Sequence, residues 1–598
     1  MLAVTTVSAR PETVEGAAAD SAANLLSLLL SLLLMCAVMV TGSTVSLWTG
    51  QRLGHFAVLR ALGTSAGRVR AMVVGDVVRL TLPAAAFGLA VGMLPLASFG
   101  RRALLEEGLF PASVELPSAA SVWGVAVGVV AGVVAIGVLS ALGSVVAAGR
   151  VGAMDLLKDQ SRSMAPRRSV ARLVTGLLMA VMFCLPLPLM MAVMDLPSMY
   201  RAALAMGLAL MLIPTLAVLA PWIVPVLTWP VALLLRLGDR RVGPIAAAGL
   251  RAAPLRTTAI AVPVLLSGGV TVALLGAGAT VADAVHRQAE QGLRADAVVV
   301  ADPGRRLPAQ PAQTAGVTAV PLIATEVTPP PMSYETASVA GAAWGVPADR
   351  LGGTLDPDVR RGSLANLDGD SFAAGVTQAD GHHWKVGQKV ALTLGDGRER
   401  TLELAAVYGR DLAFPEFLLP ERTALAHTPE PHADRILLSG APGRWPVSEG
   451  QQVQNRAEYL AGLAPRSAQD DLAGHLIVGV VAGYALLAAA NTTALAQRDR
   501  RAQRAHLRAL GLSRPQLLRC VLYEVLGAAG IGVVLSVVTA LVCLAPLALS
   551  LGNGPLPAVD VSWTAGVLGA ALLTVAVSAA LAARPLRTVQ RQFAEGRS

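Results

Sequence analysis

Long runs of apolar residues are the feature of this sequence that most restricts its fold. Examples are 203–235, 521–549 and 561–583, and each exceeds the roughly 20 residues that a helix needs to cross a bilayer. Inside a bilayer the backbone must satisfy its own hydrogen bonds, so runs of this kind form helices. Only 15% of the residues are charged, whereas soluble domains average about 25%. The sequence therefore predicts a polytopic α-helical membrane protein.

We expect about nine spans of this kind along the chain. They cover 25–47, 73–98, 121–148, 173–194, 203–235, 257–281, 476–496, 521–549 and 561–583. Arginine concentrates in the loops 50–72, 149–172, 236–256 and 497–519. Because positively charged loops stay on the cytoplasmic side, we expect these loops and the C-terminus to be cytoplasmic in a multi-pass cell-membrane protein.

Residues 283–471 differ from the rest, because charged residues, proline and glycine become frequent there. Short runs typical of strands occur at 295–301, 317–327, 338–344 and 390–394. Gly395-Asp396-Gly397 separates the last of these from another run at 401–407, which predicts a β-hairpin. The segment is long enough for its own core, and it follows the sixth span. We therefore expect one extracytoplasmic α+β domain here.

A pentapeptide that occurs twice relates the two halves of the chain. Leu59-Arg60-Ala61-Leu62-Gly63 recurs as Leu507-Arg508-Ala509-Leu510-Gly511, each time in a basic segment between two apolar runs. The same offset places Asp76 on Glu524. Self-similarity at a fixed offset indicates a duplicated unit. Around the first copy apolar residues recur at helical spacing, which predicts an amphipathic interfacial helix that Gly63 ends or bends.

The repeat divides the chain into two pseudo-repeated units. The expected parts are 1–24, a remnant of an outer-domain end; 25–158, a first unit of three spans; 159–256, two linking spans and a cytoplasmic loop; 257–282, the first span of the second unit; 283–471, its outer domain; and 472–598, its last three spans. The remnant is inferred because Arg10 and Glu12 match Arg456 and Glu458 before the seventh span. The first unit is therefore expected to lack an opening helix and an outer domain, through a misassigned start, a split gene or a shortened family member.

These repeated motifs resemble the FtsX-like permease family, the membrane subunits of MacB/LolC-type mechanotransmission ABC transporters. The resemblance rests on the two pentapeptides with Asp76 and Glu524, on the unit ends at Arg150 and Arg584, and on 384–397, which is similar to a periplasmic strand pair of the family. It implies a cytoplasmic coupling helix that docks on a separate ATPase. The ATPase-coupling residues implied in this chain are Arg60, Leu62, Gly63, Asp76, Arg508, Leu510, Gly511 and Glu524.

The sequence also indicates what the chain does not do itself. It has no G-x-x-x-x-G-K-[ST] loop, so ATP hydrolysis is expected on a partner P-loop chain and this subunit is expected to be non-catalytic. The pair His382-His383 has no third ligand at a suitable spacing, so no metal and no cofactor are expected. No basic patch alternates with stacking aromatic residues, so nucleic acid is not an expected partner. The expected partners are the ATPase, the bilayer and a second permease copy.

Three functions remain open from the sequence. The first is a permease subunit that couples ATP hydrolysis to movement of the outer domain, for export or extraction of an amphiphile, peptide, antibiotic or lipoprotein. The second is a regulatory or signalling scaffold of the same family. The third is an ion-coupled secondary transporter, which should carry matching carboxylates near the middle of the membrane. Asp76 and Glu524 match but are expected near one face, which favours the first two.

Overall fold

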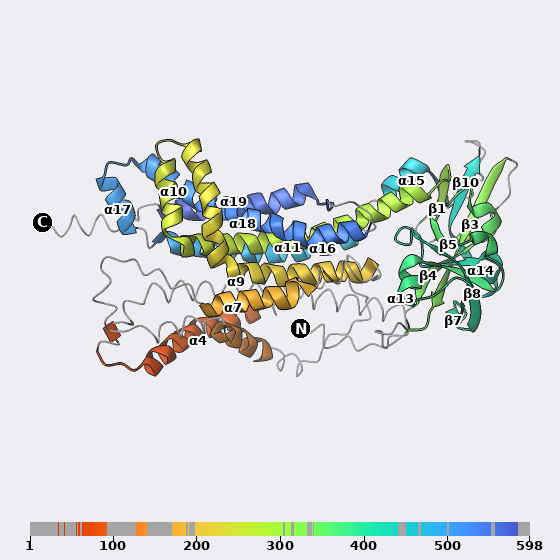
Figure 1. The fold of residues 1–598 in the computed structure, drawn as a ribbon, viewed down its shortest axis with the longest axis horizontal. Helices are drawn as coiled ribbons and strands as arrows, with labels where there is room; N and C mark the ends of the chain where they lie inside the picture. The colour runs from red at the N-terminus through yellow and green to blue at the C-terminus, as the bar shows by residue number, and fades with distance from the viewer. Residues whose placement is uncertain are drawn as a thin grey trace.

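A computed structural model of the chain describes residues 62–91, 127–139, 170–186, 198–302, 305–311, 316–331, 340–440, 450–463, 468–498, 501–551 and 556–583, with the single positions 34, 41, 56, 58, 59, 189 and 338. The described molecule is elongated, with a bundle of helices at one end and a β-sheet domain at the other (Figure 1). The first expected span, 25–47, lies outside the described residues except for two single positions.

Six of the described helices are long and apolar enough to cross a membrane. They are α4 (Ala66–Val91), α9 (Ser198–Gly238), α11 (Pro254–Gly292), α16 (Ala468–Arg498), α18 (Arg514–Ser550) and α19 (Val561–Ala583). The expected third and fourth spans coincide with shorter apolar helices, Val127–Leu139 and α7 (Val170–Met179). α7 continues into the π-helix η3 (Ala180–Cys184). A membrane protein with an additional sheet domain is thereby confirmed, whereas the total of nine spans stays a prediction.

The helix α11 forms the centre of the bundle. It contacts α9, α16, α18 and α19, and Leu265, Leu266 and Val270 on it are buried against α9 and α18. Small residues let the helices approach closely, as is common in membrane bundles. A Cβ added to Gly268 would lie 2.6 Å from side-chain atoms of both Leu568 and Ser536, so α18 and α19 pack tightly against α11.

The first half of the chain contributes a smaller group of described helices. α4 packs against Val127–Leu139, where a Cβ on Gly137 would lie 2.9 Å from Thr81 Cγ2. α7 packs against α9 in the same way, because a Cβ on Gly176 would lie 2.5 Å from the Leu219 side chain. α7 is therefore joined to the central bundle through α9.

The described residues of the sheet domain form eleven strands. They are β1 (Ala297–Ala301), β2 (Leu307–Pro308), β3 (Val317–Thr328), β4 (Gly341–Val346), β5 (Val359–Gly362), β6 (Ser371–Gly375), β7 (Lys389–Leu394), β8 (Glu399–Tyr408), β9 (Phe417–Pro420), β10 (His432–Gly440) and β11 (Gln451–Asn455). The strand order is β11-β1-β10-β3-β4-β9-β6-β8-β5, with β2 beside β10 and β7 beside both β3 and β8. β4–β9 and β6–β8 are the parallel pairs among the pairings of these strands.

Short helices cover this sheet, and two apolar cores lie on it. The helices are α12 (Ala348–Leu351), the 3₁₀-helix η4 (Leu364–Asn366), α13 (Val376–Gly381), α14 (Glu421–Ala426) and α15 (Arg456–Leu463). One core contains Phe372, Leu404 and Phe417. The other contains Trp344 and Tyr408, and it also includes Ala289 and Leu293 from the end of α11. The end of α11 is therefore part of the sheet domain's own core.

The predicted hairpin is confirmed. Lys389–Leu394 and Glu399–Tyr408 pair antiparallel, and Gly397 between them has φ +77°, a conformation that glycine adopts without a steric penalty. The expected strands at 295–301, 317–327 and 338–344 also occur, as β1, β3 and β4, with shifts of a few residues.

Candidate functional site

The two pentapeptides lie in two segments whose described residues share the same backbone hydrogen bonds. We name residues 58–64 the first tip loop and residues 506–512 the second. In the second tip loop, the helix α17 (Arg501–Ala509) ends with the Leu512 N–H donating to the Leu507 carbonyl at 3.2 Å and the Leu510 N–H donating to the His506 carbonyl at 3.0 Å. Gly511 has φ +95°. This is the Schellman arrangement of a helix C-terminus, which requires a left-handed residue.

The described residues of the first tip loop repeat both of these hydrogen bonds. The Thr64 N–H donates to the Leu59 carbonyl and the Leu62 N–H to the Val58 carbonyl, both at 3.0 Å, and Gly63 has φ +93°. These residues correspond one by one to those of the second tip loop. The expectation that Gly63 ends a helix is therefore confirmed, and the sequence repeat is also a repeat of the backbone.

A serine follows each tip loop and starts the next helix. The Ser65 hydroxyl accepts the Arg68 N–H at 3.4 Å at the start of α4. At the start of α18, the Ser513 N–H donates to Gln516 Oε1 at 2.9 Å. Side-chain capping of this kind satisfies the free polar groups of a helix terminus. Each tip loop is thus fixed at both ends, between a helix that closes on a glycine and a helix that opens on a serine.

Each tip loop exposes one leucine. Leu62 and Leu510 both have 78% of their surface exposed, and α17 lies at the end of the bundle opposite the sheet domain (Figure 1). Arg508 is exposed beside Leu510, whereas Arg60 lies outside the described residues. An apolar side chain presented beside a guanidinium at a rigid tip is suited to a partner surface, since exposed apolar groups rimmed by charge mark interaction sites.

Glu524 lies elsewhere, inside the bundle. Only 3% of its surface is exposed, and its carboxylate contacts Arg256 Nη2 at 2.7 Å. The same guanidinium donates to the Gly249 carbonyl at 3.2 Å, on the short helix α10 (Gly243–Ala252). The pair therefore holds α10, α11 and α18 together. Asp76, its counterpart on α4, is half-buried.

The eight sequence-predicted residues thus separate into two groups. Those of the tip loops that the structure describes, Leu62, Gly63, Arg508, Leu510 and Gly511, are exposed. The two carboxylates lie further along the helices that follow. From the sequence, Arg256 is interpreted only as one of the arginines of a cytoplasmic loop. Its position at the start of an apolar run is the signal that could have indicated a buried arginine with an acidic partner.

A second arginine fixes the base of the second tip loop. Arg504 on α17 has only 8% of its surface exposed, and its Nη2 donates to the Gln497 carbonyl at 2.7 Å. Gln497 lies at the end of α16, where helix carbonyls lack partners within the helix. A cation at that position is also favoured by the helix dipole. The second tip loop is therefore attached to α16 as well as to α18.

The other end of α11 is joined to the sheet domain by polar contacts. Gln288 Oε1 accepts the N–H groups of Leu412 at 3.1 Å and Ala413 at 3.3 Å. The Asp356 N–H donates to the Gly292 carbonyl at 2.7 Å. A Cβ added to Gly292 would lie 2.5 Å from the Phe414 ring. The sheet domain and the end of α11 therefore form one closely packed joint.

The residues considered for a metal site do not gather in the described part of the chain. No group of three or more His, Cys, Asp or Glu side chains among the described residues is arranged to hold a metal ion. His382 stacks on Trp384, with ring centroids 4.3 Å apart, and His383 occupies a turn with φ +58°. Of the two histidines, His382 therefore packs in the sheet domain, and His383 is exposed.

Comparison with known families identifies the repeated unit. The family model described as FtsX-like permease C-terminal matches residues 27–151 and 476–590. Each match contains one tip loop, so the two matches coincide with the two halves of the sequence repeat. No curated protein matches the chain at a significant level. The chain therefore contains two regions that match the C-terminal domain of FtsX-like permeases, a family of membrane permeases of the ABC-transporter type.

Proposed function

We propose that this chain couples ATP hydrolysis by a separate P-loop ATPase to movement of the sheet domain. FtsX-like permeases generally work with an ABC ATPase partner and are typically non-catalytic membrane subunits. The observation that carries the proposal is the pair of tip loops with matching backbone hydrogen bonds, each with a leucine that is 78% exposed. Two equal tips on one end of a bundle fit the two equal subunits of an ATPase dimer.

The tip loops favour a protein partner over lipid headgroups. Their backbone is fixed by hydrogen bonds at both ends, and pre-ordered contact residues lose less freedom on binding. The exposed Arg508 offers a rigid fork of donors to a carboxylate on the partner. In this proposal Leu62 and Leu510 fill pockets on the ATPase, and Arg508 and Arg60 pair with acidic groups at the rims.

A continuous path of contacts supports transmission from the second tip loop to the sheet domain. The tip loop leads directly into α18, and Glu524 of α18 contacts Arg256 of α11. α11 then runs to Gly292, where its end packs in the sheet domain. In this proposal Glu524 is a positioning residue within the path and Asp76 has the corresponding place in the first unit.

The spans give a reason to propose an amphiphilic substrate. In the described spans of the second half of the chain, charged side chains lie toward the helix ends, and α19 from Val561 to Ala583 carries none. In the first half, α4 carries Asp76 and Arg79 near its middle. A polar solute would need polar side chains along its path through the membrane. Because burying such side chains in the bilayer is costly, they are found mainly where they serve transport. Export or extraction of an amphiphile, peptide, antibiotic or lipoprotein by the moving sheet domain is therefore proposed. The sheet domain would be extracytoplasmic and the C-terminus cytoplasmic.

The test uses the double variant Leu62→Asp, Leu510→Asp. The protein is purified from membranes, and copurifying chains are searched for a P-loop ATPase by mass spectrometry. Leu556→Asp is the matched control, because Leu556 is also highly exposed, at 74%, and lies in the segment that leads into α19. An ATPase that copurifies with wild type and with the control, but not with the double variant, supports docking through the tip loops.

A second pair of variants separates the charge from the apolar contact. Arg60→Glu with Arg508→Glu should weaken the same association and make it less dependent on salt, since exposed ion pairs are screened. If no ATPase is recovered with wild type even after crosslinking, the coupling proposal fails. Regulatory scaffolding and ion-coupled transport would then be the functions to test.

A further inference from the structure

We propose that the groove between α16 and α19 binds the acyl chain of a membrane lipid in the leaflet next to the sheet domain. The groove has a volume of about 360 Å³ and is lined by Leu486, Ser562, Trp563, Gly566, Val567 and Ala570. That volume lies in the range of small-molecule sites, about 300–1,000 Å³. The two tip loops and the ATPase play no part in it.

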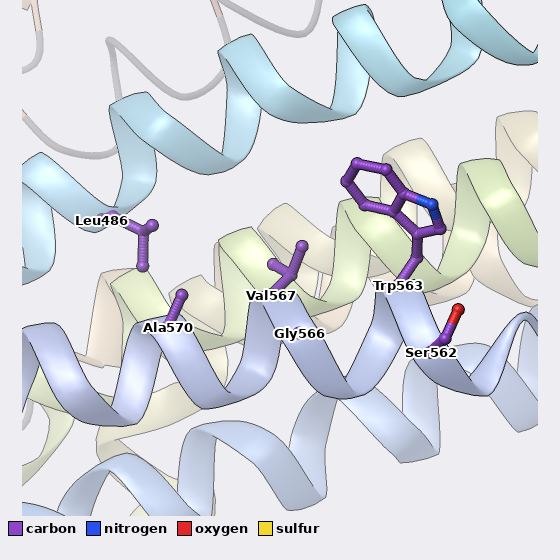
Figure 2. A pocket seen from close by; sticks show the side chains of 6 residues that line it. All are labelled: Leu486, Ser562, Trp563, Gly566, Val567 and Ala570. Carbon is purple, nitrogen blue, oxygen red and sulfur yellow. The ribbon is translucent and has the colours of Figure 1, made fainter.

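The groove exists because two packed helices separate. Ala489 of α16 and Ala571, Val575 and Ala579 of α19 are buried in one cluster, so the helices are close there. Toward the start of α19, Leu486 approaches from α16 while Val567, Ala570 and the Trp563 ring come from α19, as Figure 2 shows. Gly566 leaves the floor open, since a Cβ added there would meet nothing within 4 Å.

The polarity of the groove changes along its length. Its outermost residues, Ser562 and Trp563, follow Asp560, whose Oδ1 accepts both their N–H groups, at 3.0 and 3.2 Å. The remaining lining is apolar. From Ser562 to Ala570 the helix rises about 12 Å at 1.5 Å per residue, close to the roughly 15 Å half-thickness of a hydrocarbon core. A groove with a polar mouth at the interface and an apolar floor within one leaflet matches an amphiphile.

The indole of Trp563 supports this placement. Tryptophan is enriched where the hydrocarbon core meets the headgroups, because its ring is apolar and its N–H is polar. Trp563 is 44% exposed at the start of a membrane-crossing helix. The Asp560 carboxylate beside the mouth disfavours an anionic headgroup. A zwitterionic lipid such as phosphatidylethanolamine, which offers an ammonium group, is therefore the occupant that we infer.

Substitution of the glycine floor tests the proposal directly. Full-length protein is placed in nanodiscs of phosphatidylethanolamine and phosphatidylglycerol that contain a small fraction of phosphatidylethanolamine with a diazirine in one acyl chain. After irradiation, crosslinked peptides are mapped without ATP or an ATPase partner. We expect labelling of 562–570 and of the α16 segment around Leu486.

Gly566→Leu should reduce that labelling about tenfold, because losing the burial of about two methylene groups changes binding by that factor. Gly569→Leu is the matched control. Gly569 lies on the same helix and also faces open space, but it does not line the groove. Ala570→Phe is a second variant that fills the groove. If Gly566→Leu does not fold, the labelling of Ala570→Phe tests the proposal in its place.

Three results would overturn the proposal. The first is equal labelling in wild type, Gly566→Leu and Gly569→Leu, which would mean ordinary lipid contact along α19. The second is no label in 562–570 of the wild type. The third is obtained with a photo-crosslinking residue in place of Val567: its crosslinking to another part of this chain or to a second copy would mean that protein covers the groove.

Discussion

The Glu524 carboxylate lies 2.7 Å from Arg256 Nη2, across 268 positions of sequence and between two different helices. Both groups are largely withdrawn from solvent, with side-chain exposures of 4% and 15%. The pair therefore joins the helix that follows the second tip loop to the helix that carries the sheet domain. Its removal is the most direct way to separate the two.

Removing one partner of this pair should strongly destabilise the protein. Glu524→Ala leaves a buried guanidinium without its partner, and such changes lower the free energy of unfolding by about 3–5 kcal/mol. Replacing both, as in Arg256→Met with Glu524→Met, should recover most of the loss, since an apolar pair of similar size can be neutral. Denaturant unfolding in detergent measures both. A double variant as unstable as the single one would contradict this account.

The two tip-loop glycines should tolerate no ordinary side chain. Gly63 and Gly511 have φ near +95°, and the left-handed conformation costs other residues about 1–2 kcal/mol. Because a Cβ at either position would meet nothing within 4 Å, the penalty comes from the backbone alone. Gly511→Asn should therefore be milder than Gly511→Ala.

The control for the tip-loop glycines is Gly67→Ala, which also faces open space but lies within α4. That change should be neutral or stabilising, as helix interiors favour alanine. Thermal midpoints and association with the ATPase are measured for all three variants. A loss in Gly67→Ala equal to that in Gly511→Ala would show that backbone strain is not the cause.

Asp411 should make the stability of the sheet domain depend on pH. Burial raises the pKa of Asp411, although hydrogen bonds from Thr377 and the charge of Arg360 oppose the change. The pKa of Asp411 is therefore higher in the folded protein than in the unfolded chain, where it is about 3.9. Proton binding stabilises the fold fully at pH values below the unfolded pKa, and this stabilisation is lost as the pH rises through the folded pKa. In the wild type the thermal midpoint should therefore fall between acid and neutral pH, and Asp411→Asn should remove that fall.

The control for Asp411 is Asp370→Asn, since the Asp370 side chain is 84% exposed. It should keep the pH profile of the wild type. The prediction is wrong if Asp411→Asn and the wild type lose stability in parallel as the pH is raised.

The joint between α11 and the sheet domain should loosen when Gln288 loses its oxygen. Gln288→Leu removes the acceptor of the Leu412 and Ala413 N–H groups, and a buried donor without a partner costs about 1–3 kcal/mol. Hydrogen exchange at these two amides should become faster. Gln288→Glu keeps an acceptor in the same place and should restore slow exchange. Unchanged exchange in Gln288→Leu would show that other contacts hold the loop.

The proposed orientation can be tested by cysteine labelling. Cys36, Cys184, Cys520 and Cys543 are first replaced, and single cysteines are introduced in place of Arg398, which is 80% exposed on the sheet domain, or of Leu510. A membrane-impermeant maleimide should label the first in intact cells and the second only after permeabilisation. The reverse result would place the sheet domain in the cytoplasm.

Much of the helical layout follows from hydropathy, because crossing a bilayer requires a long apolar run. The ninth span was expected at 561–583 and α19 has these limits. The sixth was expected to stop at 281, whereas α11 continues to Gly292. Hydropathy reports the edge of the membrane and not the end of the helix. Asp283 and Arg287, paired at 2.8 Å one turn apart, continue the helix in a polar setting.

The sheet was harder to predict than the spans. Strands of the β7–β8 hairpin alternate in polarity and were expected, whereas β6 (Ser371–Gly375) is buried at every position and shows no alternation. Fully buried strands of this kind give no periodic signal. The tip loops were predictable, because they repeat as a local sequence. The contact of Arg256 with Glu524 was not, because nothing local in a sequence identifies a partner 268 positions away.

The unbroken length of α11 has a mechanical consequence. At 1.5 Å per residue, its 39 residues make a rod of about 58 Å. Its two ends lie in different surroundings: the first packs in the helix bundle, where Arg256 pairs with Glu524, and the second packs in the core of the sheet domain around Leu293. A tilt of about 5° at the first end would carry the second through about 5 Å at this length. A small movement of the tip loops would thus displace the sheet domain by several ångströms.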